Sequence, residues 1–274
     1  MDAQRYAAFT RRLVERLATD PDVIGVVALG STSGDPPAPD AWSDHDVFVV
    51  TRPGAQERFR SDPSWLPDAG RIALVHRETA HGLKVIWDDG HLAEVAVFDL
   101  VELGVARVNR WRALLDRGGV AARMEEVRRA TAERVRAEAP EDRWLVGQLL
   151  GALLVGAGRF ARGERRSGDA LVRGEAVRHL VALVRRHVAP APGAGLDDLD
   201  PLRRFERGWP EAAREIEAAL RHDVPRAAQA LLDAAERMLR ARLAWPAAAA
   251  AVRRRLAEAV TPPGSLTPAE GDQE

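Results

Sequence analysis

Two aspartates that alternate along the chain, Asp44 and Asp46, are the residues of this sequence best suited by type and spacing to chemistry. They stand at the start of an apolar run, which predicts a β-strand over 46–51. Alternate residues of a strand project to the same face, so we expect both carboxylates on one side. Two like charges that close repel each other unless a cation lies between them. Oxygen ligands in this arrangement suit Mg²⁺, which proteins usually share with substrate phosphates.

A glycine and a serine, Gly30 and Ser31, follow the preceding apolar run, which predicts a buried strand over 23–29. Such a turn offers free backbone N–H groups and a hydroxyl group to phosphate oxygens, and the glycine allows a close approach. A metal clamp beside a phosphate cradle is the equipment for nucleotidyl transfer, in which the metal neutralises charge on the leaving pyrophosphate. Asp-x-Asp and Gly-Ser are each common as structural features. Their order here, with an apolar strand before each, is more specific.

This order resembles the signature of the DNA polymerase β-type nucleotidyltransferase superfamily, in which Asp-x-Asp follows an apolar-Gly-Ser segment. The layout is most similar to bacterial nucleotidyltransferases with an appended helical domain, such as the aminoglycoside adenylyltransferases and lincosamide nucleotidyltransferases. The resemblance covers residues 20–100 with specific motifs and extends beyond Val101 only to the presence of a helical domain. It implies Mg²⁺ as the metal and ATP as the co-substrate.

The resemblance also implies a third carboxylate on a later strand, and Glu94 is the candidate. Glu94 is the only charge inside an otherwise apolar strand, where a charged residue is costly unless it is paired or bound to a metal. Asp99 is the rival, but it falls at the end of the strand, where capping a helix explains it. In the implied mechanism, Glu94 helps Asp44 and Asp46 to hold the metal and accepts the proton of the acceptor hydroxyl group. Many members of the superfamily have Asp in place of Glu94.

Other residues have weaker functional interpretations. Many superfamily members have an apolar residue where His45 stands, and we expect its side chain to point away from the two aspartates as a structural hydrogen-bonder. Lys84, the only lysine, fits an exposed strand position better than a phosphate contact. Arg204 follows another arginine and is a candidate contact for ATP phosphates, although an ordinary surface arginine explains it as well. Trp144 fits the core of the helical domain better than a substrate pocket.

The elements that must position these residues fall into two groups. The first is an α/β (α+β) nucleotidyltransferase domain over residues 1–108, with a helix at 3–19 and a mixed five-stranded sheet. The second is an all-α helical bundle over residues 109–260 that would bind the substrate, and residues 261–274 are expected to be a disordered tail. The expected strands are 23–29, 46–51, 71–76, 83–87 and 91–98, and the expected helices of the second domain are 120–138, 142–162, 169–187, 209–221, 225–243 and 247–258.

Composition excludes several classes of protein. The chain has 40 Lys and Arg against 41 Asp and Glu, which argues against a nucleic-acid coat. It has no cysteine, so disulfides, thiolate zinc sites and cysteine nucleophiles are excluded. The N-terminal segment carries charges throughout and does not resemble a secretion signal. The longest uncharged apolar stretch, Trp144 to Gly158, is shorter than the ~20 residues of a membrane span, so we expect a cytoplasmic protein with no membrane partner.

These features favour a Mg²⁺-dependent nucleotidyltransferase that moves AMP from ATP onto a hydroxyl group of a small, aminoglycoside-like molecule. The alternative is an antitoxin of the nucleotidyltransferase type that binds or AMP-modifies a partner protein. A third hypothesis is a nucleotide-binding module that has lost catalysis. An antitoxin would be a small single domain, whereas this chain carries a long helical part. An inactive module would lack a carboxylate, whereas Asp44, Asp46 and Glu94 are all present.

Overall fold

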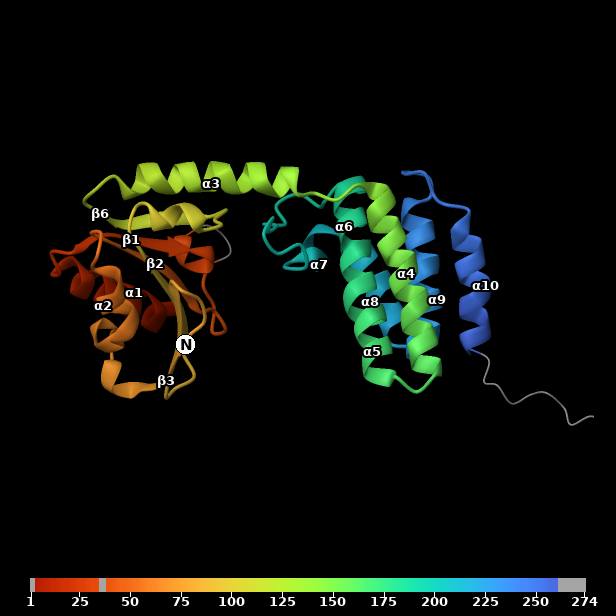
Figure 1. Ribbon diagram of the computed structural model, residues 1–274, viewed down its shortest axis with the longest axis horizontal. Coiled ribbons are helices and arrows are strands. Elements are labelled where there is room, and N and C mark those ends of the chain that lie inside the picture. Colours follow the sequence, from red (N-terminus) through yellow and green to blue (C-terminus); the bar gives the residue numbers. More distant parts are fainter. Residues whose placement is uncertain (1–2, 35–37, 261–274) are drawn as a thin grey trace, which may run out of the picture. The chain divides into compact units, whose positions relative to one another are not determined.

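The computed structural model describes residues 3–34 and 38–260 of the chain. The chain divides into two compact units, Met1–Glu138 and Ala139–Glu274 (Figure 1). The domain boundary expected at residue 108 is therefore too early, because one further strand and one long helix belong to the first unit. The expected disordered tail, residues 261–274, lies outside the described residues.

The first unit is built on a six-stranded mixed sheet with the strand order β3-β4-β5-β2-β1-β6. Strands β2 and β5 run parallel to each other, and every other neighbouring pair is antiparallel. The strands are β1 (Val23–Leu29), β2 (His45–Thr51), β3 (Ile72–Arg77), β4 (Gly82–Trp87), β5 (Leu92–Phe98) and β6 (Trp111–Asp116). The first five confirm the expected strands to within a residue or two at each end.

The sixth strand, β6, was not expected, because its sequence of Trp, Arg, Ala, Leu and Asp contains no β-branched residue. Residues of these types favour a helix as readily as a strand. Pairing with β1 holds the segment extended, with a register shift between Val26 and Val27. Leu114 and Leu115 pack against the core formed between the sheet and the first helix. Tertiary contacts thus override the local preference.

Alternation along the strands divides the sheet into two apolar faces. Val47 and Val49 of β2 belong to the core with helix α1 (Ala3–Ala18), which buries Phe9, Leu13 and Leu17 there. Val50 belongs to the opposite core, which it shares with Val120, Met124 and Val127 of helix α3 (Val120–Ala137). Figure 1 shows α3 running alongside β6. Each face of the sheet is therefore covered by a helix whose apolar stripe matches it.

Short elements complete the first unit. They are the 3-10 helices η1 (Gly30–Ser33), η2 (Pro63–Trp65), η3 (Ala69–Arg71) and η4 (Glu102–Val105), and helix α2 (Gln56–Ser61). Asp116 at the end of β6 accepts hydrogen bonds from the backbone N–H groups of Gly118, Gly119, Val120 and Ala121. These bonds satisfy donors at the start of α3 that have no partner within the helix, so Asp116 fixes where α3 begins.

The second unit is helical throughout its described elements. Its elements are α4 (Asp142–Ala161), α5 (Arg165–Asp169), the π-helical turn η5 (Ala170–Ala176), α6 (Val177–His187), α7 (Phe205–Gly208), α8 (Pro210–Leu220), α9 (Val224–Leu239) and α10 (Ala248–Val260). The expected helix over 169–187 is interrupted by η5, and the short helix α7 was not expected.

Helix α4 lies at the centre of the second unit and packs against α5, α6, α9 and α10. A Cβ atom on Gly156 would lie 2.6 Å from Val172 Cγ2, so this glycine permits close packing. A Cβ atom on Gly147 or Gly151 would meet nothing within 4 Å, so neither of these glycines is needed for helix packing. Trp144 is 49% exposed and contacts His179 edge to face, so its expected place in the core is wrong.

By length and composition alone, α4 is apolar enough to cross a membrane, with a mean hydropathy of 1.4 over a window that is 39% buried. Its buried residues include Leu145, Leu149 and Leu153, which pack in the core of the helical unit. The apolar side chains of α4 therefore pack against other helices. A helix at the centre of a bundle can be as long and as apolar as a helix that spans a membrane.

Candidate active site

The two aspartates lie on either side of a fully buried histidine. Asp44 immediately precedes β2, and Asp46 is the second residue of that strand. His45 between them has no exposed surface and packs on the α1 side of the sheet, where its ring stacks on Tyr6 with 3.7 Å between ring centroids. Alternation then places Asp46 on the opposite face of the sheet. The expectation that His45 points away from Asp46 is confirmed.

His45 is held in a closed hydrogen-bond network. Its Nδ1 atom lies 2.8 Å from His91 Nε2, and its Nε2 atom lies 3.0 Å from Thr10 Oγ1. Thr10 itself donates to the carbonyl oxygen of Tyr6. We assign donation from His91 Nε2–H to His45 Nδ1 and from His45 Nε2–H to Thr10 Oγ1, with the carbonyl oxygen of Tyr6 as a second acceptor at 3.3 Å from His45 Nε2. Burial, together with the nearby His91, lowers the pKa of His45 to about 3, so this imidazole is neutral and structural.

The Gly-Ser turn comes directly against Asp46. Gly30 begins η1 at the end of β1 with a φ of 51°, a conformation that glycine adopts at the least cost. A Cβ atom at this position would lie 2.9 Å from Asp46 Oδ2, closer than real Cβ atoms approach. Ser31 beside it is buried. The absence of a side chain at Gly30 is therefore what lets the carboxylate of Asp46 lie against the turn.

Tyr6 of α1 connects the turn to Asp44. Its hydroxyl group lies 2.5 Å from Thr32 Oγ1 and donates to the backbone carbonyl oxygen of Asp44 at 2.7 Å. Burial raises the pKa of Tyr6, and the carboxylates of Asp46 and Asp44 raise it further. Both carboxylates are thus close enough to act on the same hydroxyl group. The sequence does not reveal this role, because Tyr6 has the same helical spacing as the buried apolar residues of α1; its one distinguishing feature is that it is the only tyrosine of the chain.

Glu94 is the neighbour of Asp46 on the next strand. The parallel register pairs Asp46 with Glu94, and the antiparallel register of β4 and β5 pairs Glu94 with Lys84. Lys84 Nζ lies 3.1 Å from Glu94 Oε1 and 2.8 Å from Oε1 of Glu78. These two partners, Glu78 first, raise the pKa of Lys84. Lys84 is partly exposed as expected, but it is bound to the candidate third carboxylate.

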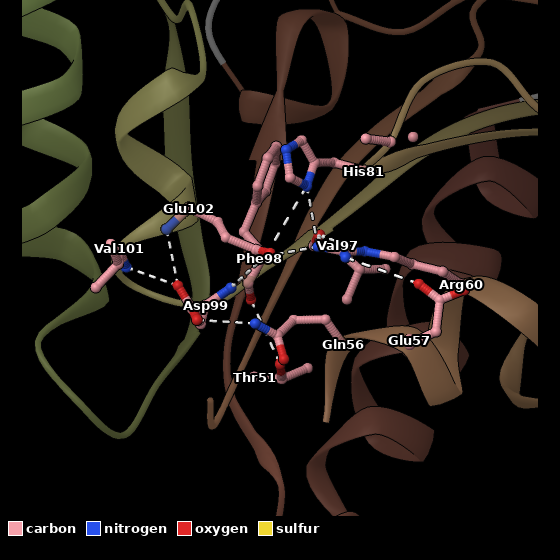
Figure 2. A network of polar contacts seen from close by, with 12 residues as sticks. Thr51, Gln56, Glu57, Arg60, His81, Val97, Phe98, Asp99, Val101 and Glu102 are labelled. Atoms are coloured by element: carbon pink, nitrogen blue, oxygen red, sulfur yellow. Dashed lines mark hydrogen bonds and ion pairs between the residues drawn. The ribbon is translucent and has the colours of Figure 1, made fainter. Parts of the chain in front are cut away.

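Asp99, the rival third carboxylate, has a structural role at the other end of β5 (Figure 2). One of its oxygens accepts from the backbone N–H groups of Val101 and Glu102, and the other accepts from Gln56 Nε2 at 2.8 Å. The rise along a strand separates residues 94 and 99 by about 16 Å. Asp99 therefore does not lie with Asp46, whereas Glu94 does.

The segment that Asp99 caps is joined to α2 by a largely buried arginine, Arg60 (Figure 2). Its guanidinium group donates to the carbonyl oxygen of Val97 and lies 2.6 Å from Glu102 Oε2 and 3.0 Å from His81 Nδ1. A buried charge is tolerated only when it is paired and hydrogen-bonded, and Arg60 is both. The polar network at this end of the sheet holds the fold together.

The donor set suits a magnesium ion that is held by few protein ligands. Among residues 3–34 and 38–260, no group of three or more His, Asp or Glu side chains is placed to hold a metal ion. Mg²⁺ commonly takes one or two carboxylates and completes its shell with water and substrate phosphates. Asp44 and Asp46 would be the two carboxylates of such a pair. The residues present therefore fit a metal that arrives with a nucleotide better than a permanent three-ligand centre.

Two cavities open beside these residues. One of about 550 Å³ is lined by Asp44 together with Arg5, Trp42, Asp89 and His91. The other, of about 500 Å³, is lined by Tyr6, Ser31, Thr32 and Arg112 among others. Both are of the size that small ligands occupy.

Arg204, the expected phosphate contact, belongs to the second unit. Its Nη1 atom donates to the carbonyl oxygen of Gly195 at 2.7 Å, and its backbone has a φ of 62°. The hydrogen bond and the left-handed backbone give this arginine a local role in the loop that precedes α7. Its contact with ATP stays a prediction.

The sequence matches no protein family among those compared and none of the curated proteins. Among solved structures, it is similar to the crystal structure of an aminoglycoside 6-adenyltransferase from Bacillus subtilis. The TM-score is 0.38 and the sequence identity 10%, over 91% of this chain and 97% of that chain. Values this low do not establish a shared fold, so the assignment of function depends on the residues described above.

Proposed function

We propose that this protein is a Mg²⁺-dependent nucleotidyltransferase that transfers AMP from ATP to a hydroxyl group of a small molecule. The observation that carries the proposal is the contact between the Gly-Ser turn and the Asp-x-Asp segment. Gly30 leaves room for the Asp46 carboxylate, and Tyr6 ties Thr32 of the turn to Asp44. These contacts support a site in which the turn would bind phosphate and the two aspartates would bind the metal.

The candidate site residues of the first unit each have a separate role in this proposal. Asp44 and Asp46 bind the magnesium ion, and the turn at Gly30 and Ser31 receives phosphate oxygens through its N–H and hydroxyl groups. The bound metal would neutralise the charge that develops on the leaving pyrophosphate. Tyr6 holds the backbone of Asp44 at a fixed distance from the turn, so that the ligands need little reorganisation when the nucleotide binds.

Glu94 is the proposed general base. It lies beside Asp46 in the register of β2 and β5, on the strand face that also carries Lys84. Its carboxylate would accept the proton from the acceptor hydroxyl group, whose oxygen attacks the α-phosphorus of ATP while the bond to pyrophosphate breaks. Its carboxylate is 40% exposed, so an acceptor molecule can reach it from solvent.

The acceptor that we propose is a polyhydroxylated, aminoglycoside-like molecule, with the helical unit as the part that selects it. Asp44 and Asp89 line a cavity of about 550 Å³, which is large enough for such a molecule. Arg204 is kept as a proposed contact for ATP phosphates.

The test is release of pyrophosphate from ATP in the presence of Mg²⁺ and a panel of aminoglycosides and other polyhydroxylated metabolites. Asp44→Asn and Glu94→Gln should each abolish release, whereas Asp99→Asn, at the far end of β5, should retain it once its folding has been verified. The proposal fails if no acceptor supports release and if, in addition, binding of ATP with Mg²⁺ is unchanged in Asp44→Asn. If Glu94→Gln keeps full activity while Asp99→Asn loses it, Glu94 is not the base.

A further inference from the structure

A row of charged residues crosses three neighbouring strands of the sheet on one face. Lys84 of β4 is paired with Glu94 of β5, which is paired with Asp46 of β2. Strands in a sheet lie about 4.8 Å apart, so each residue in the row is an immediate neighbour of the next. At the outer end of the row, Glu78 gives Lys84 a second carboxylate at 2.8 Å. The only lysine of the chain is therefore shared between a carboxylate at the candidate site and one outside it.

The ion pair decides how available Glu94 is to a metal. An ammonium group 3.1 Å from Glu94 Oε1 offsets much of the charge of that carboxylate, so Glu94 attracts a second cation less strongly than a carboxylate with no such partner would. This agrees with the finding that no group of three metal-binding side chains is assembled within the described residues. Because Lys84 and Glu94 are 37% and 40% exposed, water weakens their attraction, and the contact can be exchanged rather than locked.

We propose that Lys84 is a positioning residue that keeps Glu94 out of the coordination shell of the metal and reserves it for the acceptor hydroxyl group. This inference rests on the proposed function, because it assumes a divalent cation at Asp44 and Asp46. Glu78 binds the same ammonium group from the other side, which helps to hold it beside Glu94.

A third carboxylate beside the metal site could act as a metal ligand or as a general base, and Lys84 would restrict Glu94 to the second role. A carboxylate bound to a metal is a poor base, because the metal's charge stabilises its ionised form. A carboxylate next to a single, partly exposed ammonium group is stabilised far less. Lys84 therefore allows Glu94 to lie beside the metal site without being bound to the metal.

The experiment is a double-mutant cycle measured by binding of Mn²⁺ alone, with no nucleotide or acceptor present. Glu94→Gln is made in the natural chain and in a Lys84→Met background, and Mn²⁺ binding is followed by electron paramagnetic resonance. In the natural chain, Glu94→Gln should weaken binding by less than about threefold, because Glu94 is not a ligand. In the Lys84→Met background, the freed Glu94 should strengthen binding about tenfold, and Glu94→Gln should remove that gain.

Two controls make the result specific. Arg77→Gln removes a positive charge of the neighbouring strand β3, which is paired with Glu57 rather than Glu94, and should leave Mn²⁺ affinity unchanged. Lys84→Gln repeats the loss of charge with a polar side chain, in case Lys84→Met disturbs folding, and should also strengthen binding.

The outcomes separate this inference from the proposed function. If Glu94→Gln weakens Mn²⁺ binding equally in both backgrounds, Lys84 does not govern Glu94, and the inference is wrong even if AMP transfer is found. If Glu94→Gln weakens Mn²⁺ binding only in the Lys84→Met background but no acceptor is ever modified, Lys84 controls Glu94 and the proposed transferase activity is wrong. If Asp46→Asn leaves Mn²⁺ affinity unchanged, the metal site and the role of Lys84 both fall.

Discussion

Substitution of Gly30 by alanine tests the contact that joins the turn to Asp46. The added methyl group would begin 2.9 Å from Asp46 Oδ2, well inside van der Waals contact, so the carboxylate must move. The residue also has a φ of 51°, which a side chain makes less favourable. One methyl group therefore perturbs both the backbone of the turn and the ligand beside it.

The two effects have different sizes and different readouts. A left-handed backbone costs a non-glycine residue about 1–2 kcal/mol, which should appear as lost stability. A carboxylate displaced by several tenths of an ångström loses its place as a ligand, and we expect Mn²⁺ affinity to fall at least about tenfold, equivalent to ~1.4 kcal/mol. Urea unfolding of the full chain measures the first effect, and Mn²⁺ binding measures the second.

Gly54→Ala is the matched control. Gly54 follows β2 with a φ of 88°, and a Cβ atom there would meet nothing within 4 Å. This variant carries the backbone cost alone, so it should lose comparable stability and keep full Mn²⁺ affinity. The reasoning is refuted if Gly30→Ala binds Mn²⁺ as well as Gly54→Ala does, because the approach of Asp46 to the turn would then have no bearing on the metal.

Three further predictions follow from buried or capping groups. The folded-state pKa of His45, about 3, lies below its unfolded value of 6.5. The stability contributed by neutral His45 is therefore fully present above pH 6.5. Below pH 6.5, the free energy of unfolding should fall by up to about 1.4 kcal/mol per pH unit. Urea unfolding at pH 7 and pH 5 measures this fall, which should be smaller in His45→Gln. Asp116→Ala should cost about 1–2 kcal/mol of stability by uncapping α3 while Mn²⁺ affinity stays constant; a loss of affinity would contradict a purely capping role. Arg60→Ala should cost about 1–3 kcal/mol by removing the hydrogen bonds to Glu102 and to the carbonyl oxygen of Val97, and an unchanged unfolding midpoint would show that the network in Figure 2 does not stabilise the fold.

Much of the first unit could be predicted because local patterns and tertiary structure agree there. The strands at 23–29 and 46–51 are runs of β-branched residues, and the turn before His91 carries glycine. Strand β6 could not be found, because Trp111 to Asp116 has no strand preference of its own and is extended only through its pairing with β1. Because β6 was missed, the end of the first unit was placed before this strand, at residue 108.

The site was predictable in its residue types but not in its connections. Asp44, Asp46 and Gly30 follow from the motif, and alternation along β2 correctly turned His45 away from Asp46. The hydrogen bond of Tyr6 joins segments far apart in the sequence, which a sequence read segment by segment does not reveal. The ion pair of Lys84 with Glu94 crosses the hairpin of β4 and β5 and depends on its register, which the sequence pattern does not fix. Asp44 itself precedes β2, so strand alternation does not fix its direction.

The central claim is that an alcohol attacks the α-phosphorus of ATP, and the fate of labelled phosphates tests it most directly. ATP labelled at the α-phosphate or at the γ-phosphate is incubated with the protein, Mg²⁺ and an acceptor that supports pyrophosphate release. We predict that the α-label appears on the acceptor, that the γ-label appears only in pyrophosphate, and that Asp46→Asn abolishes both. Appearance of the γ-label on the acceptor would mean phosphoryl transfer and would contradict the account.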